Sequence, residues 1–384
     1  MLLQIRLAGT LVLATTPLAA QRPLPPATIE FTEPFTTLAG VVELGGDRIA
    51  VLDREEQRVV VADVRTGTVR PVARIGDGPR EYRMPWTLMD LAGDSAAIYD
   101  AANRRLLVIR PDGTPGDFLG IPGTSSTVHL PMGPNGPAAI DHAGRFYWTG
   151  NRFDLRPGVR PNSLADSVPI LRQAAGARRP DTLGHLRRPN LGARGELDAA
   201  DAERHARLAW PMRDDWTVLP NGTVVVVRAP EHRLEVLEQS NRGRMIALPA
   251  AALPLTSWLR SRWEARRCGE RTLAYRVRSD GSLSRPTLTG GSAQTCGPHT
   301  WPEIVPGFLA GETVADPRGA VWIRRTPRTV RDASTYDIVP VTPQATRQVV
   351  TLPSGVRVVA VGARRIYAVR TDDDGLQYLQ VIPR

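Results

Sequence analysis

The chain has 384 residues, of which 42% are hydrophobic and 23% are charged, so it can bury a large core and is neither disordered nor collagen-like. Its 34 glycines and 34 prolines argue against a helical protein. The formal net charge is +10, and all 49 basic residues are arginines. The excess is concentrated in residues 145–213 and 250–311, which marks either an anionic partner or a genome that favours arginine codons.

Residues 1–20 have the pattern of a secretory signal peptide. Arg6 is their only charge, an apolar run covers residues 7–13, and small residues precede Gln21. The run is too short to span a bilayer, and no later segment is long and apolar enough to do so. We therefore expect a periplasmic or secreted bacterial protein, cleaved near Ala20, whose residues 21–384 form a single domain. The alternative is an uncleaved anchor or an incorrect start codon.

Two cysteines, Cys268 and Cys296, are present in the whole chain. In an oxidising compartment they can form a disulfide, which would hold an otherwise loosely attached insertion. No cluster of His or Cys lies nearby to complete a zinc site, and an exported free thiol is readily oxidised. A disulfide is therefore the favoured prediction.

A repeated unit dominates the chain from residue 40 onward. Six strand-like quartets, each preceded by a tight turn and an apolar run, occupy residues 49–52, 96–99, 145–148, 224–227, 320–323 and 366–369. Gly or Asn-Gly in these turns supplies the positive φ that a tight hairpin needs. Third strands follow at residues 58–63, 105–110, 167–172, 233–238, 336–341 and 377–382. Four strands per unit, at a basic spacing of 46–49 residues, predict a six-bladed β-propeller.

The sixth unit has only three strands before the chain ends at Arg384, which leaves a sheet edge exposed. Residues 28–35 are otherwise unassigned, so we expect them to supply the missing outer strand and close the ring. The two longest intervals between units hold insertions at about residues 187–213 and 250–311, in which residues 196–208 and 257–267 have helical character. The prediction is an all-β, six-bladed propeller with two partly helical insertions.

The first two units carry motifs of a known family. Residues 76–82, Gly-Asp-Gly-Pro-Arg-Glu-Tyr, resemble the Gly-x-Gly-Pro-x-Glu-aromatic run between the blades of exported bacterial six-bladed β-propellers related to NHL-repeat proteins. Residues 97–100, 103–106 and 111–113 are similar to that family's strand-Asp-turn-strand-Asp-Gly pattern. The resemblance implies the propeller fold, and many such propellers have no assigned activity.

The residues that close the quartets should form a ring at the mouth of the central channel. They are Asp53, Asp100, Thr149, Arg228, Arg324 and Arg370. The last three stand where the family pattern has Asp, and together they could hold a carboxylate, sulfate or phosphate. The alternative is that the two aspartates bond the backbone of their own turns while the arginines point outward and pair with acids.

The insertions bring tryptophans alongside arginines on the face where successive blades are joined. Trp210, Trp258, Trp263 and Trp301 lie in or beside them. Arginine interleaved with tryptophan suits an acidic polysaccharide, a phosphorylated ligand or an acidic protein. The alternative is that the tryptophans pack the insertions onto the blades. Nucleic acid is not expected, because the exported chain has no basic stripe on a recognised binding motif.

Three histidines, His129, His232 and His299, fall in connections on the same face and could ligate zinc with an open fourth position. Some propeller lyases related to this fold use histidine-bound metal, although the spacing here bears no regular relation to the repeat. His142 falls in a turn on the opposite face. The run of Asp at residues 372–374 suggests calcium, but it lacks the closing Glu of a calcium loop and suits a hairpin turn better.

These observations predict an exported, monomeric binding module for a protein partner or an anionic ligand. The alternative is a hydrolase or lyase acting at the channel mouth, with zinc or calcium as the metal if one is needed. The sequence contains no nucleophile elbow, Walker loop or His-Glu-x-x-His motif, and no cofactor is firmly implied.

Overall fold

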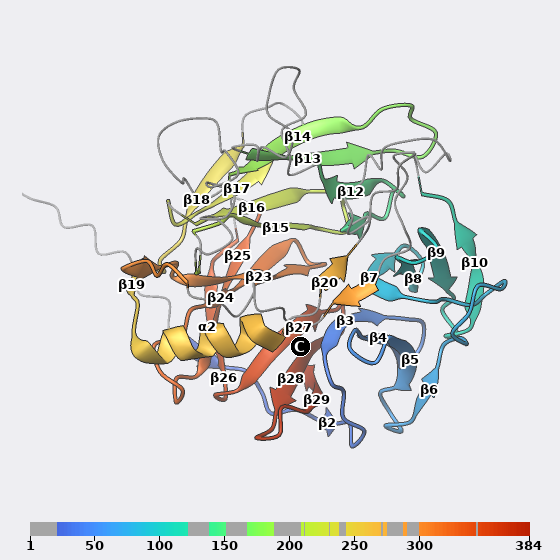
Figure 1. Cartoon of the computed structure of the whole chain (residues 1–384), viewed down its shortest axis with the longest axis horizontal. Helices are drawn as coiled ribbons and strands as arrows, with labels where there is room; N and C mark the ends of the chain where they lie inside the picture. The colour runs from blue at the N-terminus through green and yellow to red at the C-terminus, as the bar shows by residue number, and fades with distance from the viewer. Residues whose placement is uncertain are drawn as a thin grey trace, which may run out of the picture.

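Six antiparallel sheets are arranged in a ring in the computed structural model of the chain (Figure 1). The structure describes residues 21–121, 138–150, 167–187, 209–210, 212–229, 231–237, 243–269, 272–274, 287–289, 299–342 and 345–384, with the backbone alone at 266–269, 272–274 and 287–289. Each sheet is one of the repeated units, so the predicted six-bladed propeller is confirmed. We number the blades in chain order.

The first three blades come from the N-terminal half of the chain. Blade 1 contains β3 (Leu38–Glu43), β4 (Arg48–Asp53), β5 (Arg58–Asp63) and β6 (Val69–Pro71). Blade 2 contains β7 (Pro85–Leu91), β8 (Ser95–Asp100), β9 (Arg105–Ile109) and β10 (Pro115–Leu119). Blade 3 contains β11 (Ala139–Ile140), β12 (Phe146–Thr149), β13 (Ser167–Gln173) and β14 (Asp181–Arg187).

The last three blades follow the same plan. Blade 4 contains β15 (Asp215–Val218), β16 (Val224–Arg228), β17 (Arg233–Leu237) and β18 (Arg244–Ala247). Blade 5 contains β23 (Phe308–Asp316), β24 (Ala320–Arg325), β25 (Ser334–Pro340) and β26 (Gln348–Leu352). Blade 6 contains β27 (Val356–Val361), β28 (Arg365–Thr371) and β29 (Gln377–Pro383).

The two ends of the propeller differ in what they join. The inner strand of each blade is its first, and it pairs antiparallel with the second strand through a tight turn. We call the end with these turns the turn end. The opposite end, where one blade passes to the next and where second strands lead into third strands, is the junction end.

The N-terminal segment closes the ring, as predicted. Strand β2 (Ile29–Glu30) pairs antiparallel with β29 as the fourth strand of blade 6, and a single bridge joins Phe35 to Gln377. The pairing is interrupted between them, and the side chains of Phe31 and Phe35 are both buried between blades 6 and 1. An additional strand that the sequence did not predict, β1 (Gln21–Pro23), pairs parallel with the outer edge of β26 in blade 5.

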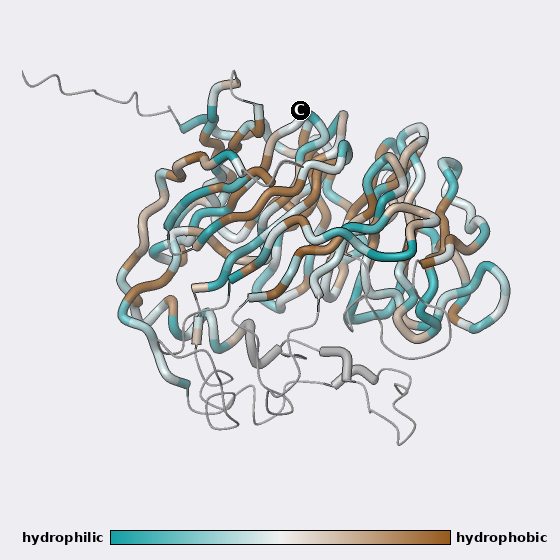
Figure 2. Tube along the Cα trace, turned by 90° about the horizontal axis from the view of Figure 1, so that it is seen from above, coloured by the Kyte–Doolittle hydropathy of each residue, from teal (hydrophilic) through white to brown (hydrophobic). Residues whose placement is uncertain are grey.

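The hydrophobic core is divided among the gaps between blades. Six clusters of buried apolar residues each lie between two successive blades. In β4, Ile49 and Val51 pack toward blade 6, whereas Ala50 and Leu52 pack toward blade 2. Both faces of the strand are buried, which is why the quartets are continuously apolar. Seen from above, hydrophobic stretches run through the strands (Figure 2).

The quartet of blade 3 begins one residue later than the sequence predicted. Strand β12 starts at Phe146, because Arg145 belongs to the turn before it. The backbone N–H and the side-chain Nε of Arg145 both donate to Asp141, at 2.9 and 2.6 Å. The Asp run predicted as a hairpin turn is one, since Asp372 accepts the backbone N–H groups of Asp374 and Leu376 between β28 and β29.

The insertion between blades 4 and 5 contains the one helix that the structure describes. Helix α2 (Ser257–Gly269) matches the prediction for residues 257–267, and two short ladders accompany it. These pair β19 (Leu253–Pro254) with β22 (Ile304–Val305) and β20 (Thr272–Ala274) with β21 (Thr287–Thr289). Among the described residues, no helix has the length and apolar character needed to cross a membrane.

Several predictions from the sequence fall outside the described residues. They are the signal peptide at residues 1–20, the helix at 196–208, His129, and the pairing of Cys268 with Cys296. These stay predictions.

Candidate functional site

Asp53 and Asp100 occupy equivalent positions at the junction end of blades 1 and 2. The buried carboxylate of Asp53 accepts the backbone N–H groups of Thr36 and Thr37, which precede β3, at 2.8 and 3.1 Å. It also accepts two N–H groups of its own turn. Asp100 accepts the N–H of Met84 at 3.0 Å, and Asn103 donates to it at 2.8 Å. Both carboxylates therefore hold the start of an inner strand against the end of a second strand.

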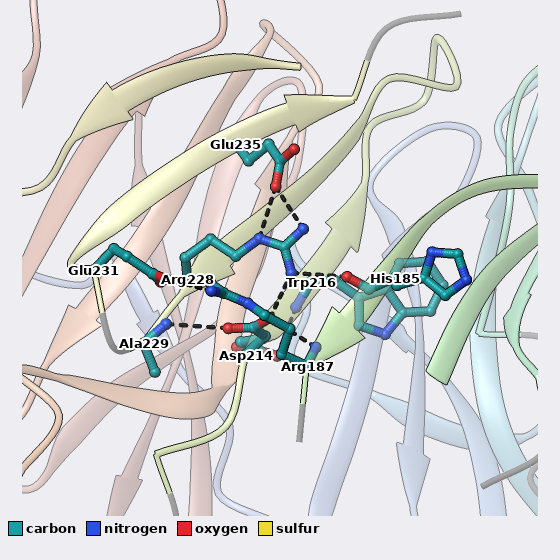
Figure 3. A network of polar contacts seen from close by, with 9 residues as sticks. His185, Arg187, Asp214, Trp216, Arg228, Ala229, Glu231 and Glu235 are labelled. Atoms are coloured by element: carbon teal, nitrogen blue, oxygen red, sulfur yellow. Dashed lines mark hydrogen bonds and ion pairs between the residues drawn. The ribbon is translucent and has the colours of Figure 1, made fainter. Parts of the chain in front are cut away.

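Arg228 is the centre of a polar network at the junction end of blade 4 (Figure 3). Its guanidinium donates to Glu235 Oε2 at 2.7 Å, to the carbonyl of His185 in blade 3 at 2.7 Å, and to Asp214. Asp214 also accepts the backbone N–H groups of Arg187 and Ala229. The network thus ties the last strand of blade 3 to the first two strands of blade 4.

Arg324 and Arg370 are likewise paired with carboxylates. Buried Arg324 donates to Glu312 Oε2 at 2.6 Å and to the hydroxyl of Ser334 at 2.9 Å. Arg370 makes a bidentate pair with Glu30 of the ring-closing strand β2. The hydrogen bond from Arg370 is the main reason that the pKa of Glu30 lies below its usual value. Each of the three arginines therefore has its own acidic partners.

The histidines proposed from the sequence lie in different elements. His232 occupies the turn before β17 with a positive φ of 51°, and its carbonyl accepts the N–H of Leu248. His299 packs edge-on against Trp263, with ring centroids 4.7 Å apart. Within the described part of the chain, no three His, Cys, Asp or Glu side chains are grouped so that they could hold a metal ion.

Helix α2 is docked at the junction end of blade 5. Thr256 Oγ1 accepts the N–H of Leu259 at 3.2 Å and caps the first turn of the helix. Leu259 is buried against Trp210, Val305 and Leu309, the last of which belongs to the inner strand β23. The backbone of Ala209 also bonds to that of Thr300, which joins the two insertions. The tryptophans thus pack the insertions onto the blades, as one of the two alternatives predicted.

Two arginine–tryptophan pairs lie along α2, one on each flank of the side that packs on the blades. The guanidinium of Arg260 lies 4.8 Å from the ring centroid of Trp301, and that of Arg262 lies 5.5 Å from that of Trp258. Both arginines are exposed, whereas the tryptophans are partly buried. The sequence of α2 contains four arginines and one glutamate. We call Trp258, Arg260, Arg262 and Trp301 the Arg–Trp face.

A cavity of about 390 Å³ lies in the central channel at the turn end. The later residues of all six inner strands line it, together with the turns that follow them. Its walls are mainly apolar side chains, and its ionisable residues are Glu43, Asp90, Asp94, His142 and Tyr367. None of the quartet-closing residues lines this cavity.

The ionisable groups of the cavity are only partly neutralised. His142 Nε2 lies 3.0 Å from Asp90 Oδ2, and both side chains are nearly half exposed. Burial raises the pKa of Asp90, the hydrogen bond to His142 opposes this, and the charges of Glu43 and Asp94 raise it further. Glu43 accepts the hydroxyl of Tyr367 at 3.0 Å, and burial followed by the charge of Glu43 raises the pKa of Tyr367.

Sequence reasoning missed the acidic residues of this cavity. His142 was placed correctly at the end opposite the insertions, but all the site residues predicted from the sequence were assigned to the junction end. Glu43 and Asp90 are 47 residues apart, the same interval that separates Asp53 from Asp100. An acid repeated near the end of successive inner strands was therefore the signal that could have found them.

No known family profile matches the chain, and no curated protein matches it. Similar solved structures include a Bacteroides fragilis protein provisionally described as exported, with 10% identity over 96% of this chain and 98% of that one, and a TM-score of 0.43. Regucalcin from Agrobacterium tumefaciens, described as calcium-binding, has 12% identity over 96% and 98%, and a TM-score of 0.38. Virginiamycin B lyase from Staphylococcus aureus has 11% identity over 93% and 98%, and a TM-score of 0.35.

At these identities the likeness concerns the fold alone. The assignment itself rests on the strand pairing, which gives six successive sheets around one channel and closes the last of them with a strand from the N-terminal segment. The chain is therefore a six-bladed β-propeller.

Proposed function

We propose that this chain is an exported binding protein that holds an anionic ligand on the Arg–Trp face. The observation that carries the proposal is the stacking of two exposed guanidinium groups on tryptophan rings. Stacking on Trp301 holds the guanidinium plane of exposed Arg260 in place, and the N–H edge of Arg260 can make a bidentate bond to a carboxylate or sulfate. The arginines of the quartets are less suited to this role, because they are already paired with Asp214, Glu312 and Glu30.

The ligand that this face suits best is a carboxylated polysaccharide. Partly exposed indole rings beside the guanidinium groups offer apolar surface against which a sugar ring can pack. The net charge of +10 adds long-range attraction for a polyanion. An acidic protein segment would use the same guanidinium groups, so the two kinds of partner must be separated by experiment.

Binding of polygalacturonate, poly-L-glutamate and neutral dextran at low salt would test this proposal. We expect polygalacturonate to bind most tightly, and the double variant R260A/R262A to weaken it by about tenfold or more, since each charge-assisted bidentate pair contributes on the order of 1.5–3 kcal/mol. The double variant R178A/R179A is the matched control, because it removes the same charge from the exposed β13–β14 turn at the other end of the propeller.

Three results would contradict the proposal. Equal losses in both double variants would indicate non-specific attraction to a basic protein. Unchanged binding in R260A/R262A would remove the Arg–Trp face from consideration. Tighter binding of poly-L-glutamate than of polygalacturonate would indicate an acidic protein partner instead of a polysaccharide.

The enzymatic alternative, a metal-dependent hydrolase or lyase with His129, His232 and His299, stays a prediction because His129 lies outside the described residues. Zinc or calcium analysis of the purified protein, followed by the H232A/H299A variant, tests it directly. Export, cleavage near Ala20 and the monomeric state also stay predictions, which N-terminal sequencing of the secreted protein and its mass in solution would check.

A further inference from the structure

We propose that the turn-end cavity is a second binding site, which takes a small organic cation consisting of an amine on a short apolar body. This site is independent of the Arg–Trp face, since it lies at the other end of the propeller. Nothing in the sequence motifs pointed to it.

The size and walls of the cavity suit a small molecule. Its volume of about 390 Å³ lies near the lower end of the range of small-molecule sites, roughly 300–1,000 Å³. Aliphatic side chains such as Val41, Leu88 and Ile140 make most of the wall, and a few polar groups converge among them. This combination of apolar surface and few polar groups is typical of sites that bind a compact ligand and fix its orientation.

The charge of the cavity is opposite to that of the protein. The chain carries a net charge of +10, yet the ionisable groups on the cavity wall are three carboxylates, one histidine and one tyrosine, and no arginine lines it in the described structure. The carboxylates interact with one another, because the charges of Glu43 and Asp94 both raise the pKa of Asp90. A positive charge placed among them would relieve this repulsion.

The spacing of these groups favours an organic cation over a metal ion. In the described structure, they do not form a group of three that could surround one ion. Glu43 and Asp90 belong to the inner strands of neighbouring blades, and Asp94 lies in the exposed turn after β7. An ammonium group has three donors and can bond to one carboxylate while it is attracted by the others at longer range.

Asp90 is the residue best placed to receive the ammonium group. His142 holds Oδ2 of Asp90 at 3.0 Å, and Oδ1 has no hydrogen-bond donor among the described residues. The imidazole therefore orients the carboxylate and leaves its second oxygen directed to a ligand. Glu43 is held by Tyr367 and by the backbone N–H of Ala363, and it also pairs with Arg364 at 3.9 Å, so its negative charge on the adjacent wall is fixed in place and partly neutralised.

Calorimetric titration with pentylamine, 1-pentanol and pentanoate separates charge from apolar burial, because the three probes share one chain length. At neutral pH and low salt, we expect pentylamine to bind at least about tenfold more tightly than the other two, as the loss of one charge-assisted bond predicts. We expect the double variant D90N/D94N to lose most of this preference. Asparagine keeps the size of both side chains and tolerates the positive φ of 53° at Asp94.

The control variant is D373N, which removes a carboxylate from the exposed β28–β29 turn at the junction end. It should bind pentylamine as the unmodified protein does, and all variants should stay folded, with thermal unfolding midpoints close to that of the unmodified protein. Absence of pentylamine binding, equal binding of pentanol, or an equal loss in D373N would overturn the proposal. Calcium binding that D90N/D94N abolishes would also overturn it, in favour of a metal site.

Discussion

Two groups of charged side chains, one at each end of the propeller, are in opposite states. At the junction end, Asp53 and Asp214 are buried and surrounded by backbone and guanidinium donors. At the turn end, the side chains of Asp90 and His142 are nearly half exposed beside a cavity, and within the described part of the chain they bond only to each other. The comparison teaches that the density of charge in the sequence does not locate a binding site. Charges whose bonds are all used internally stabilise the fold, whereas charges with bonds to spare are available to a ligand.

The largest effect is expected from removing the buried carboxylate of blade 4. The substitution Asp214→Ala leaves the guanidinium of Arg228, only 8% exposed, without one of its two acidic partners, and it also leaves two backbone N–H groups without their acceptor. We expect the free energy of unfolding to fall by about 3 kcal/mol, since a buried ion pair is broken and two N–H groups lose their acceptor. Urea denaturation monitored by tryptophan fluorescence would measure it.

Two further variants test whether burial is the cause. Glu231→Gln, which weakens the largely exposed pair with Arg187, should cost less than about 1 kcal/mol. The double variant D214A/R228M should recover part of the lost stability, because it also removes the buried guanidinium of Arg228 that has lost Asp214. If D214A were as mild as E231Q, the junction end would not depend on its buried ion pairs.

A smaller loss is expected from the cap at blade 1. Asp53→Ala leaves the N–H groups of Thr36, Thr37, Glu55 and Glu56 without their acceptor, and we expect a cost of about 2 kcal/mol. Asp53→Asn keeps one acceptor oxygen and should retain part of the stability. Equal stability of the Ala variant and the unmodified protein in urea would mean that water replaces the carboxylate.

At the turn end, stability should depend more on backbone geometry than on charge. Gly93 has a φ of +75°, and a Cβ placed there meets no heavy atom within 4 Å, so Gly93→Ala is expected to cost about 1 kcal/mol through backbone strain alone. Gly120 is equally open but lacks the positive φ, so Gly120→Ala should stay within about 0.5 kcal/mol of the unmodified protein. Equal effects on the thermal midpoint would argue against strain.

The smallest effect concerns the pH dependence contributed by Asp90. Burial raises its pKa in the folded state, so the stability it contributes is present below the ordinary Asp pKa and is lost as pH rises through the folded value. The free energy of unfolding of Asp90→Asn, relative to that of the unmodified protein, should therefore increase as pH rises from about 4 to neutrality. The side chain is nearly half exposed, so the gain should be well under about 1 kcal/mol. A difference in unfolding free energy that stays constant over this pH range would contradict the raised pKa.

Much of the fold could be predicted because each blade has a recognisable pattern within a short stretch of sequence. The second strands are buried on both faces, which requires an uninterrupted apolar quartet, and tight turns with positive φ mark their starts. Ring closure followed from the missing fourth strand of blade 6. Strand β1 was missed because three residues that lie exposed on a sheet edge carry no burial pattern.

The candidate sites were predicted less well, for reasons that lie in the side chains. Arg228, Arg324 and Arg370 were correctly located on their strands, but the sequence did not show that Asp214, Glu312 and Glu30 would be their partners. The alternative in which aspartates cap turns and arginines pair with acids describes the geometry observed. The tryptophans of the insertions are visible in the sequence, but which arginine stacks on which tryptophan could be seen only in the structure.

The sequence alone determined the number of blades and the order of their strands, because each strand buried on both faces is marked by its own consecutive apolar residues and by the turn before it. Only the tertiary structure decided which charges are neutralised and where a cavity remains. Arg370 and its partner Glu30 are 340 residues apart, and Asp90 and His142 are separated by 52. Arg370 and Glu30 meet only when the ring closes, and Asp90 and His142 meet only when blades 2 and 3 pack together, so their chemistry is a property of the assembled blades.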